Sequence, residues 1–223
     1  SWFHSNNAAE SSDELYAAFE LVDGGDLAAA QTQLDAVIAD GSGNYPVLAE
    51  FRKAGVLAKN GQVAEAVAAY DALANSQSDA RLRELALVLA GTLMVDAGTL
   101  ADVDMRVASV ATDDSALRNA AREALGLAQY KAGEFAEAQA SFEAVINDPL
   151  TQTNTRNRMG YYLAQLLAQG AVPPAVGSDA DAAASAIDTL VTDDVPAAEP
   201  AAAPETPATD ASAAPTETAP AAQ

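Results

Sequence analysis

Five glycines recur along the chain at almost equal intervals, and each follows a stretch whose apolar residues are spaced as in an α-helix. The intervals are 36, 37, 35 and 37 residues. After all but the last glycine, a second helical stretch begins at once. A period of this length indicates a repeat of two helices joined by a turn, and such repeats stack into solenoids that usually bind other proteins. The glycines are Gly25, Gly61, Gly98, Gly133 and Gly170.

The copy around Gly133 matches the tetratricopeptide pattern most closely. That pattern has Leu-Gly in the first helix and Ala-x3-Phe in the second. Here Leu125-Gly126 precede the turn, and Ala138 and Phe142 follow it. The small residue lets the two helices approach closely, and the large residue lies on the same face one turn further on. The same spacing of four residues separates Ala66 from Tyr70 in the second copy and Ala30 from Leu34 in the first.

The remaining copies are less regular. The third has Val103 and Val107 in place of Ala-x3-Phe, and Pro173-Pro174 prevent a second helix after the last glycine. We therefore predict an all-α fold, a tetratricopeptide-like helix-turn-helix solenoid of about four repeats, one of them degenerate, with a terminal helix near 153–169. A plain helical bundle is the alternative.

Local signals agree with helices throughout. Pro46 stands at a plausible first helical position after Asn44, and Ser115 and Thr155 are suitable N-caps. No segment shows the period-two alternation that strands require.

Charge is distributed unevenly along the chain. The formal net charge is −21, and residues 171–223 hold nine acidic residues and no Lys or Arg. Nucleic acids and anionic lipids would be repelled by such a chain, so neither is expected as a direct ligand. There are no cysteines, which excludes disulfides and thiol chemistry.

These shifts in composition divide the chain into four parts. The chain begins at Ser1 rather than methionine, and Trp2-Phe3 could be the aromatic edge of a missing membrane helix, in which case residues 1–10 are a linker that follows the anchor. An incidental apolar start to the first helix is the alternative. Residues 11–170 form the repeat domain, and 171–192 a linker that can hold a short helix. The Pro/Ala/Thr-rich acidic segment 193–223 is predicted to be a disordered tail, acting either as a spacer or only as a solubilising element.

The residues that enzymes and metal sites require are scarce. The single histidine, His4, lies at the start of the chain, and serines without a histidine partner carry no hydrolase signal. The acidic pairs Asp102/Asp104 and Asp113/Asp114 lack metal-ligand spacing and are better explained as loop or cap residues. We therefore predict no enzymatic activity, no metal and no cofactor.

The first helix of each repeat should line the concave face of the solenoid. Projecting the repeat register onto these helices predicts a mostly apolar groove with two basic residues, which could accept a peptide or helix. The alternative is that the same residues pack the interior of a short, tightly curled stack. The predicted groove consists of Phe19, Leu48, Phe51, Lys59, Leu127, Tyr130 and Lys131, with Leu15 and Val88 also projected towards it.

Basic residues gather in the second repeat and at the start of the third. In so acidic a chain this cluster could dock an acidic segment of a partner, although charges spaced in this way more often form the solvated side of a helix. The cluster comprises Arg52, Lys53, Lys59, Arg81 and Arg83.

Four runs resemble the alphaproteobacterial branch of the YfgM-like family, ancillary subunits of the Sec translocon. The resemblance covers about residues 10–170. It implies a short cytoplasmic start, one membrane helix upstream, and a periplasmic tetratricopeptide-like domain associated with the translocon and periplasmic chaperones. It implies no catalytic residues, and the Pro/Ala/Thr tail departs from the family pattern. The runs are Leu48–Gly61, Leu85–Ala90, Ala121–Gly126 and Arg156–Met159.

Two functional hypotheses follow. The first is a non-enzymatic scaffold at the periplasmic face of the bacterial inner membrane, held by an upstream anchor and binding translocon subunits or a periplasmic chaperone through its repeat surface. The membrane tether would raise the effective concentration near the exit site, so weak contacts would suffice. The second is a structural or assembly subunit of another envelope complex, with a large permanent interface.

Overall fold

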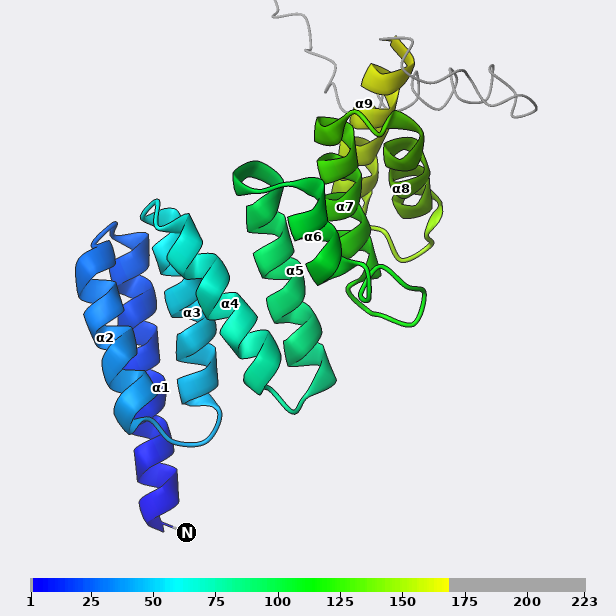
Figure 1. Cartoon of the computed structure of the whole chain (residues 1–223). Coiled ribbons are helices and arrows are strands. Elements are labelled where there is room, and N and C mark those ends of the chain that lie inside the picture. The colour runs from blue at the N-terminus through cyan, green and yellow to red at the C-terminus, as the bar shows by residue number, and fades with distance from the viewer. Residues whose placement is uncertain (1, 169–223) are drawn as a thin grey trace, which may run out of the picture.

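The computed structural model describes residues 2–168, with side chains from residue 9 onward. Within this range it has nine α-helices and no strand. They pack in chain order as four pairs followed by a single helix, which makes the elongated stack of Figure 1 and confirms the predicted all-α solenoid of four repeats with a terminal helix. The helices are α1 (Trp2–Asp23), α2 (Leu27–Asp40), α3 (Tyr45–Lys59), α4 (Val63–Ser76), α5 (Ala80–Ala97), α6 (Leu100–Val107), α7 (Arg118–Ala132), α8 (Phe135–Asn147) and α9 (Thr153–Ala168).

Three of the four turns inside the repeats use glycine for its left-handed backbone. Gly25, Gly61 and Gly133 have φ angles of 82°, 81° and 82°, which L side chains rarely adopt. Gly98 differs, since its φ of −128° is open to any residue. There the next helix begins instead with a capping box on Thr99, so the degenerate third repeat makes its turn in a different way.

The Thr99 capping box is expected to be worth about 1 kcal/mol of stability. The Thr99 hydroxyl accepts a hydrogen bond from the Asp102 amide at 3.3 Å, and the Asp102 carboxylate accepts one from the Thr99 amide at 2.9 Å. Because α6 has only 8 residues, it has few other bonds to hold its start. Urea denaturation of Thr99→Ala should show this loss. Thr112→Ala, at an exposed loop threonine, is the control, and equal losses in both variants would contradict the prediction.

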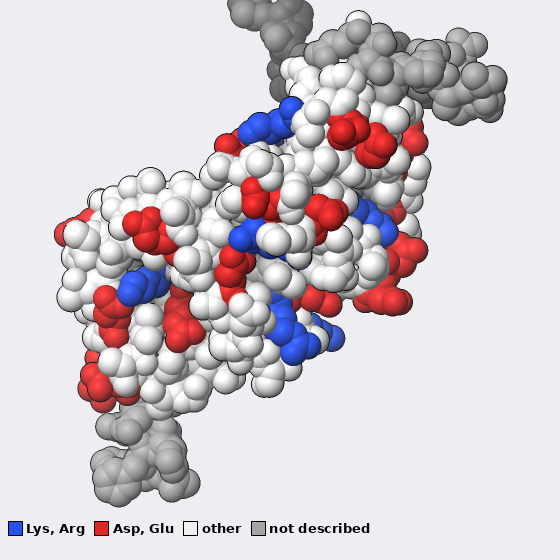
Figure 2. All heavy atoms as spheres, in the orientation of Figure 1, with Lys and Arg blue, Asp and Glu red and all other residues white. Residues whose placement is uncertain are grey.

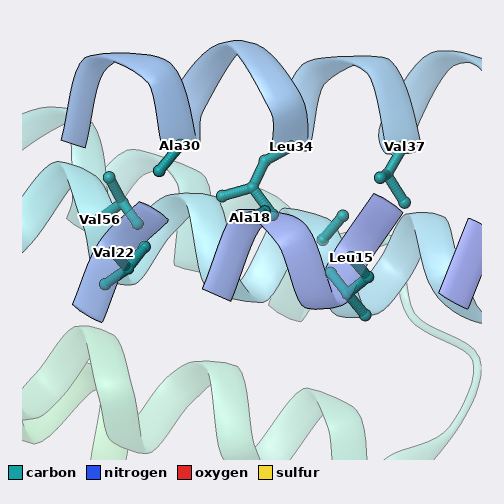
Figure 3. Close-up of a cluster of buried hydrophobic side chains, with 8 residues drawn as sticks. Leu15, Ala18, Val22, Ala30, Leu34, Val37 and Val56 are labelled. Carbon is teal, nitrogen blue, oxygen red and sulfur yellow. The ribbon is translucent and has the colours of Figure 1, made fainter. Parts of the chain in front are cut away.

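In each repeat, the two helices pack together where a small residue of the first lies opposite a large residue of the second. Seven residues before the turn glycine, the first helix carries a buried alanine or glycine, and nine residues after it the second helix carries a buried large side chain. Figure 3 shows Leu34 of α2 reaching Ala18 of α1. In the fourth repeat, a Cβ atom on Gly126 would lie 2.6 Å from the Phe142 ring. The four pairs are Ala18 with Leu34, Ala54 with Tyr70, Gly91 with Val107 and Gly126 with Phe142.

Buried apolar side chains form four small clusters rather than one central core. Each cluster contains a repeat and the first helix of the next one: α1–α2–α3, α3–α4–α5, α5–α6–α7 and α7–α8–α9. A helix pair therefore cannot bury its own apolar face without the helix that follows. This explains α9, whose Met159 and Leu166 are fully buried and complete the last cluster of the described residues.

The stack is not uniform in its middle. The first helices of repeats 1 and 2, α1 and α3, contact each other, as do α5 and α7. By contrast, the backbones of α3 and α5 do not approach each other in this way, and the two halves are joined mainly through α4 packed on α5 (Figure 1). The solenoid is thus two pairs of repeats joined at one junction.

Helix α1 begins at Trp2 and continues past residue 10 into the repeat domain. Two predicted N-caps need correction. Thr155 lies inside α9, which begins at Thr153, and is not its N-cap. Ser115 lies two residues before the N-cap residue Leu117, although its hydroxyl does accept a hydrogen bond from the Leu117 amide at 3.0 Å. The predicted linker 171–192 and tail 193–223 lie outside the described residues.

Candidate interaction surface

The seven residues of the predicted groove do not share one environment. Phe51 and Leu127 are half-buried against the clusters between repeats, and Leu48 is 47% exposed. Phe19 is half-buried beneath the guanidinium of Arg52. Part of the predicted groove, Phe19, Phe51 and Leu127, therefore packs against the interior, as the alternative to a groove expected. Leu15 and Val88, also projected onto the groove, are each only 5% exposed and belong to the core.

Lys59 and Lys131 have matching structural roles. Each ends the first helix of an even-numbered repeat, and each ammonium group donates to a backbone carbonyl near the end of the first helix of the preceding repeat. Lys59 donates to Val22 at 3.3 Å, and Lys131 donates to Val95 at 2.6 Å. Lys131 also forms an ion pair with Asp96 at 3.1 Å. A cation near a helix C-terminus is favoured by the helix dipole. These lysines therefore stabilise the stacking within each half of the solenoid.

The aromatic side chains of the predicted groove are held by neighbouring rings. Tyr130 packs edge-on against Phe135 of the following helix, with ring centroids 5.9 Å apart. Phe51 and Tyr70 have centroids 6.2 Å apart, and the Tyr70 hydroxyl donates to the Phe51 carbonyl at 3.4 Å. Burial raises the pKa of this Tyr70 hydroxyl. These rings join the two helices of a repeat. Replacing them would therefore disturb the packing of the repeat as well as the binding of any partner protein.

The structure also separates the predicted basic cluster. Lys53 forms an ion pair with Asp35 at 2.6 Å, and Arg83 donates to the carbonyl of Gln77. Arg81 is exposed at the start of α5. On the face drawn in Figure 2, Lys and Arg atoms lie in separate patches among Asp and Glu atoms and large white areas. No continuous basic patch is formed by these five residues.

A groove that the sequence did not predict lies between α2, α3 and α4. It has a volume of about 410 Å³, and the Lys53–Asp35 ion pair stands at its edge. None of the seven predicted residues lines it. Its walls come from both helices of the second repeat, so a projection of first helices alone could not find it. The lining side chains include Ile38, Leu57, Ala69, Ala72 and Leu73.

The most enclosed ion pairs join α7 to the loop before α9. Asp148, whose side chain is 5% exposed, accepts hydrogen bonds from both Nε and Nη2 of Arg118. This contact, aided by the Leu150 amide at 2.8 Å, lowers the pKa of the Asp148 carboxyl from 3.8 to about 2. A cavity of about 410 Å³ beside Asp148 is lined by Arg118 and Arg122. Because both arginines already have carboxylate partners, the cavity has no unpaired cation for an anionic ligand.

Asp148 should make stability depend on pH at the acid end. Its pKa is lower in the folded chain than the usual 3.8, so its contribution is fully present above about pH 4 and is lost as the pH falls towards 2. Melting temperatures of the parent chain and of Asp148→Asn should differ at neutral pH and converge between about pH 4 and pH 2. If the difference between the two melting temperatures stays constant down to pH 2, the carboxylate charge of Asp148 is not what stabilises this loop.

The described residues show no arrangement typical of a metal site or of a membrane span. No group of three or more acidic or histidine side chains there is placed to hold a metal ion. Among these helices none is long and apolar enough to cross a membrane.

Comparisons with known proteins identify no relative. No family model matches the chain, and neither a curated protein nor a solved structure does.

Proposed function

We propose that this chain is a non-enzymatic scaffold that binds other proteins through the surface of its repeats. The observation that carries the proposal is the fold itself, four helix pairs stacked in one direction with exposed apolar side chains on the first helices. Tyr16 of α1 and Leu48 of α3 are 65% and 47% exposed. A solenoid presents an extended surface of this kind for protein contacts.

The finer proposal rests on the sequence resemblance to the YfgM-like family. By that resemblance, the scaffold is held at the periplasmic face of the inner membrane by an upstream anchor and binds subunits of the Sec translocon or a periplasmic chaperone. The acidic charge of the chain supports a protein partner over nucleic acid or anionic lipid.

Affinity capture of the full-length protein from membranes in mild detergent, followed by mass spectrometry, tests this proposal. We expect translocon subunits or a periplasmic chaperone to be recovered, and Leu48→Glu to reduce their recovery while the melting temperature stays unchanged. Met105→Glu, at a 73% exposed residue of α6, is the matched control. Stoichiometric, salt-resistant recovery of a different membrane complex would instead favour a structural subunit of that complex.

A further inference from the structure

Arg52 differs from the other arginines that bridge elements of the described chain, each of which donates side-chain hydrogen bonds to a carboxylate or to a backbone carbonyl. Arg106, Arg118 and Arg158 each form a double hydrogen bond with a carboxylate on a neighbouring element. Arg122 is paired with Asp113, and Arg156 donates to the backbone carbonyls of Ile146 and Asp148. Arg52 forms no ion pair with any described residue.

The surroundings of Arg52 are aromatic rather than acidic. Its guanidinium carbon lies 4.8 Å from the centre of the Phe19 ring, and its Nε is buried without an acceptor. An arginine stacked on an aromatic face is held in one orientation and keeps its terminal N–H groups directed sideways for a planar acceptor.

Exposed apolar side chains flank this guanidinium. Leu48 lies one helical turn before Arg52 on α3, and it is 47% exposed. On the adjacent α1, Tyr16 is 65% exposed and packs edge-on against Phe19, with ring centroids 6.1 Å apart. Tyr16 and Arg52 are 36 residues apart, one repeat, so they occupy equivalent positions on neighbouring first helices. We call these four residues, Tyr16, Phe19, Leu48 and Arg52, the α1–α3 face.

We propose that the α1–α3 face binds a peptide segment of a partner protein in which an Asp or Glu stands next to a large apolar residue. The partner carboxylate would accept hydrogen bonds from the terminal nitrogens of Arg52, and the apolar side chain would pack between Leu48 and Tyr16. Pairing of this kind is strong when the arginine is already oriented and partly removed from water. This inference rests on the proposed scaffold function and specifies the chemistry of its partner.

Panning the full chain against a random library of twelve-residue peptides displayed on phage tests the inference. Enriched peptides should carry Asp or Glu within two positions of Leu, Ile, Phe or Trp. Fluorescence polarisation of the best peptide should show Kd about tenfold or more weaker for Arg52→Gln. Arg81→Gln removes the same charge from an exposed site and should change Kd less than twofold. Leu48→Asp, a second variant at an exposed site, should also weaken binding.

Each other outcome overturns the inference. It fails if no peptide is enriched, if the enriched peptides lack acidic residues, or if both arginine variants lose binding equally. A synthetic peptide of residues 193–223 that competes at similar affinity would assign the face to the chain's own acidic segment. If membrane capture recovers the same translocon subunits with Arg52→Gln, the scaffold function stands and only this face is excluded.

Discussion

Replacing Phe142 by alanine is expected to lower the free energy of unfolding by about 3–5 kcal/mol, which is among the largest losses open to a single side chain here. Its ring is fully buried where α7, α8 and α9 meet, and it stacks on Tyr162 with centroids 5.6 Å apart. The cluster around it has only five buried members, so few neighbours can move to fill the cavity. Urea denaturation measures the loss, and near-ultraviolet circular dichroism should show Tyr162 losing its fixed environment.

Met105→Ala provides the comparison for Phe142→Ala. Met105 is 73% exposed on α6, and its replacement should change stability by less than about 0.5 kcal/mol. If Phe142→Ala cost less than about 1 kcal/mol, the last repeat would not be closed around this ring, and the role given to α9 would be wrong.

The regular part of the fold could be predicted from the sequence because its cause is local. A glycine in a left-handed turn and a small residue opposite a large one are properties of single positions, and they repeat at a fixed spacing. The four helix pairs of the described residues follow from them. The third repeat shows the limit, since Gly98 keeps the spacing although its turn geometry does not require glycine.

Features that depend on two repeats at once were not predictable in this way. The burial of Leu15 and Val88 depends on how closely neighbouring first helices approach, which the register alone does not specify. The wider separation of the α3 and α5 backbones likewise leaves no signal in the sequence. Lys59 and Lys131 look like solvent-facing groove residues until the preceding helix end is placed beside them.

Ion pairs between repeats leave only a weak trace in the sequence. Arg106 and Asp71 are 35 residues apart, as are Arg158 and Glu123, so each pair joins similar positions in adjacent repeats. A search for opposite charges at the repeat spacing could have found them. Arg52 could not have been singled out by that search, because its distinction is the absence of a carboxylate together with the ring of Phe19 beneath it.

Substitution of Gly126 by alanine is the second change with a large expected effect. The added Cβ would lie 2.6 Å from Cε1 and 2.9 Å from Cδ1 of the Phe142 ring, and 3.0 Å from Cβ of Ser141. Because the ring is fully enclosed, α7 and α8 must separate, and we expect a loss of about 1–3 kcal/mol despite the better helix propensity of alanine. Gly126→Val, which adds two further methyl groups at the same contact, should cost more.

Gly55→Ala is a control with the opposite expected sign. Gly55 also lies inside a first helix, but a Cβ there would meet only the Tyr70 hydroxyl, at 3.4 Å. The substitution should therefore stabilise the chain by about 0.5–1 kcal/mol through helix propensity alone. If Gly126→Ala and Gly55→Ala both stabilise, the closeness of α7 and α8 is not a requirement of the fold.

A double substitution separates the contact between Gly126 and Phe142 from the burial of either residue. Repeat 1 has alanine and leucine at these two positions, Ala18 and Leu34, and both are fully buried (Figure 3). Combining Gly126→Ala with Phe142→Leu copies that pair into repeat 4. We expect the double variant to be more stable than the sum of the two single losses predicts, by about 0.5–3 kcal/mol, because the shorter side chain makes room for the new Cβ. Additive losses would mean that the two positions contribute to stability independently. The pairing of a small with a large residue would then be a regularity of the repeats that does not determine how their helices pack.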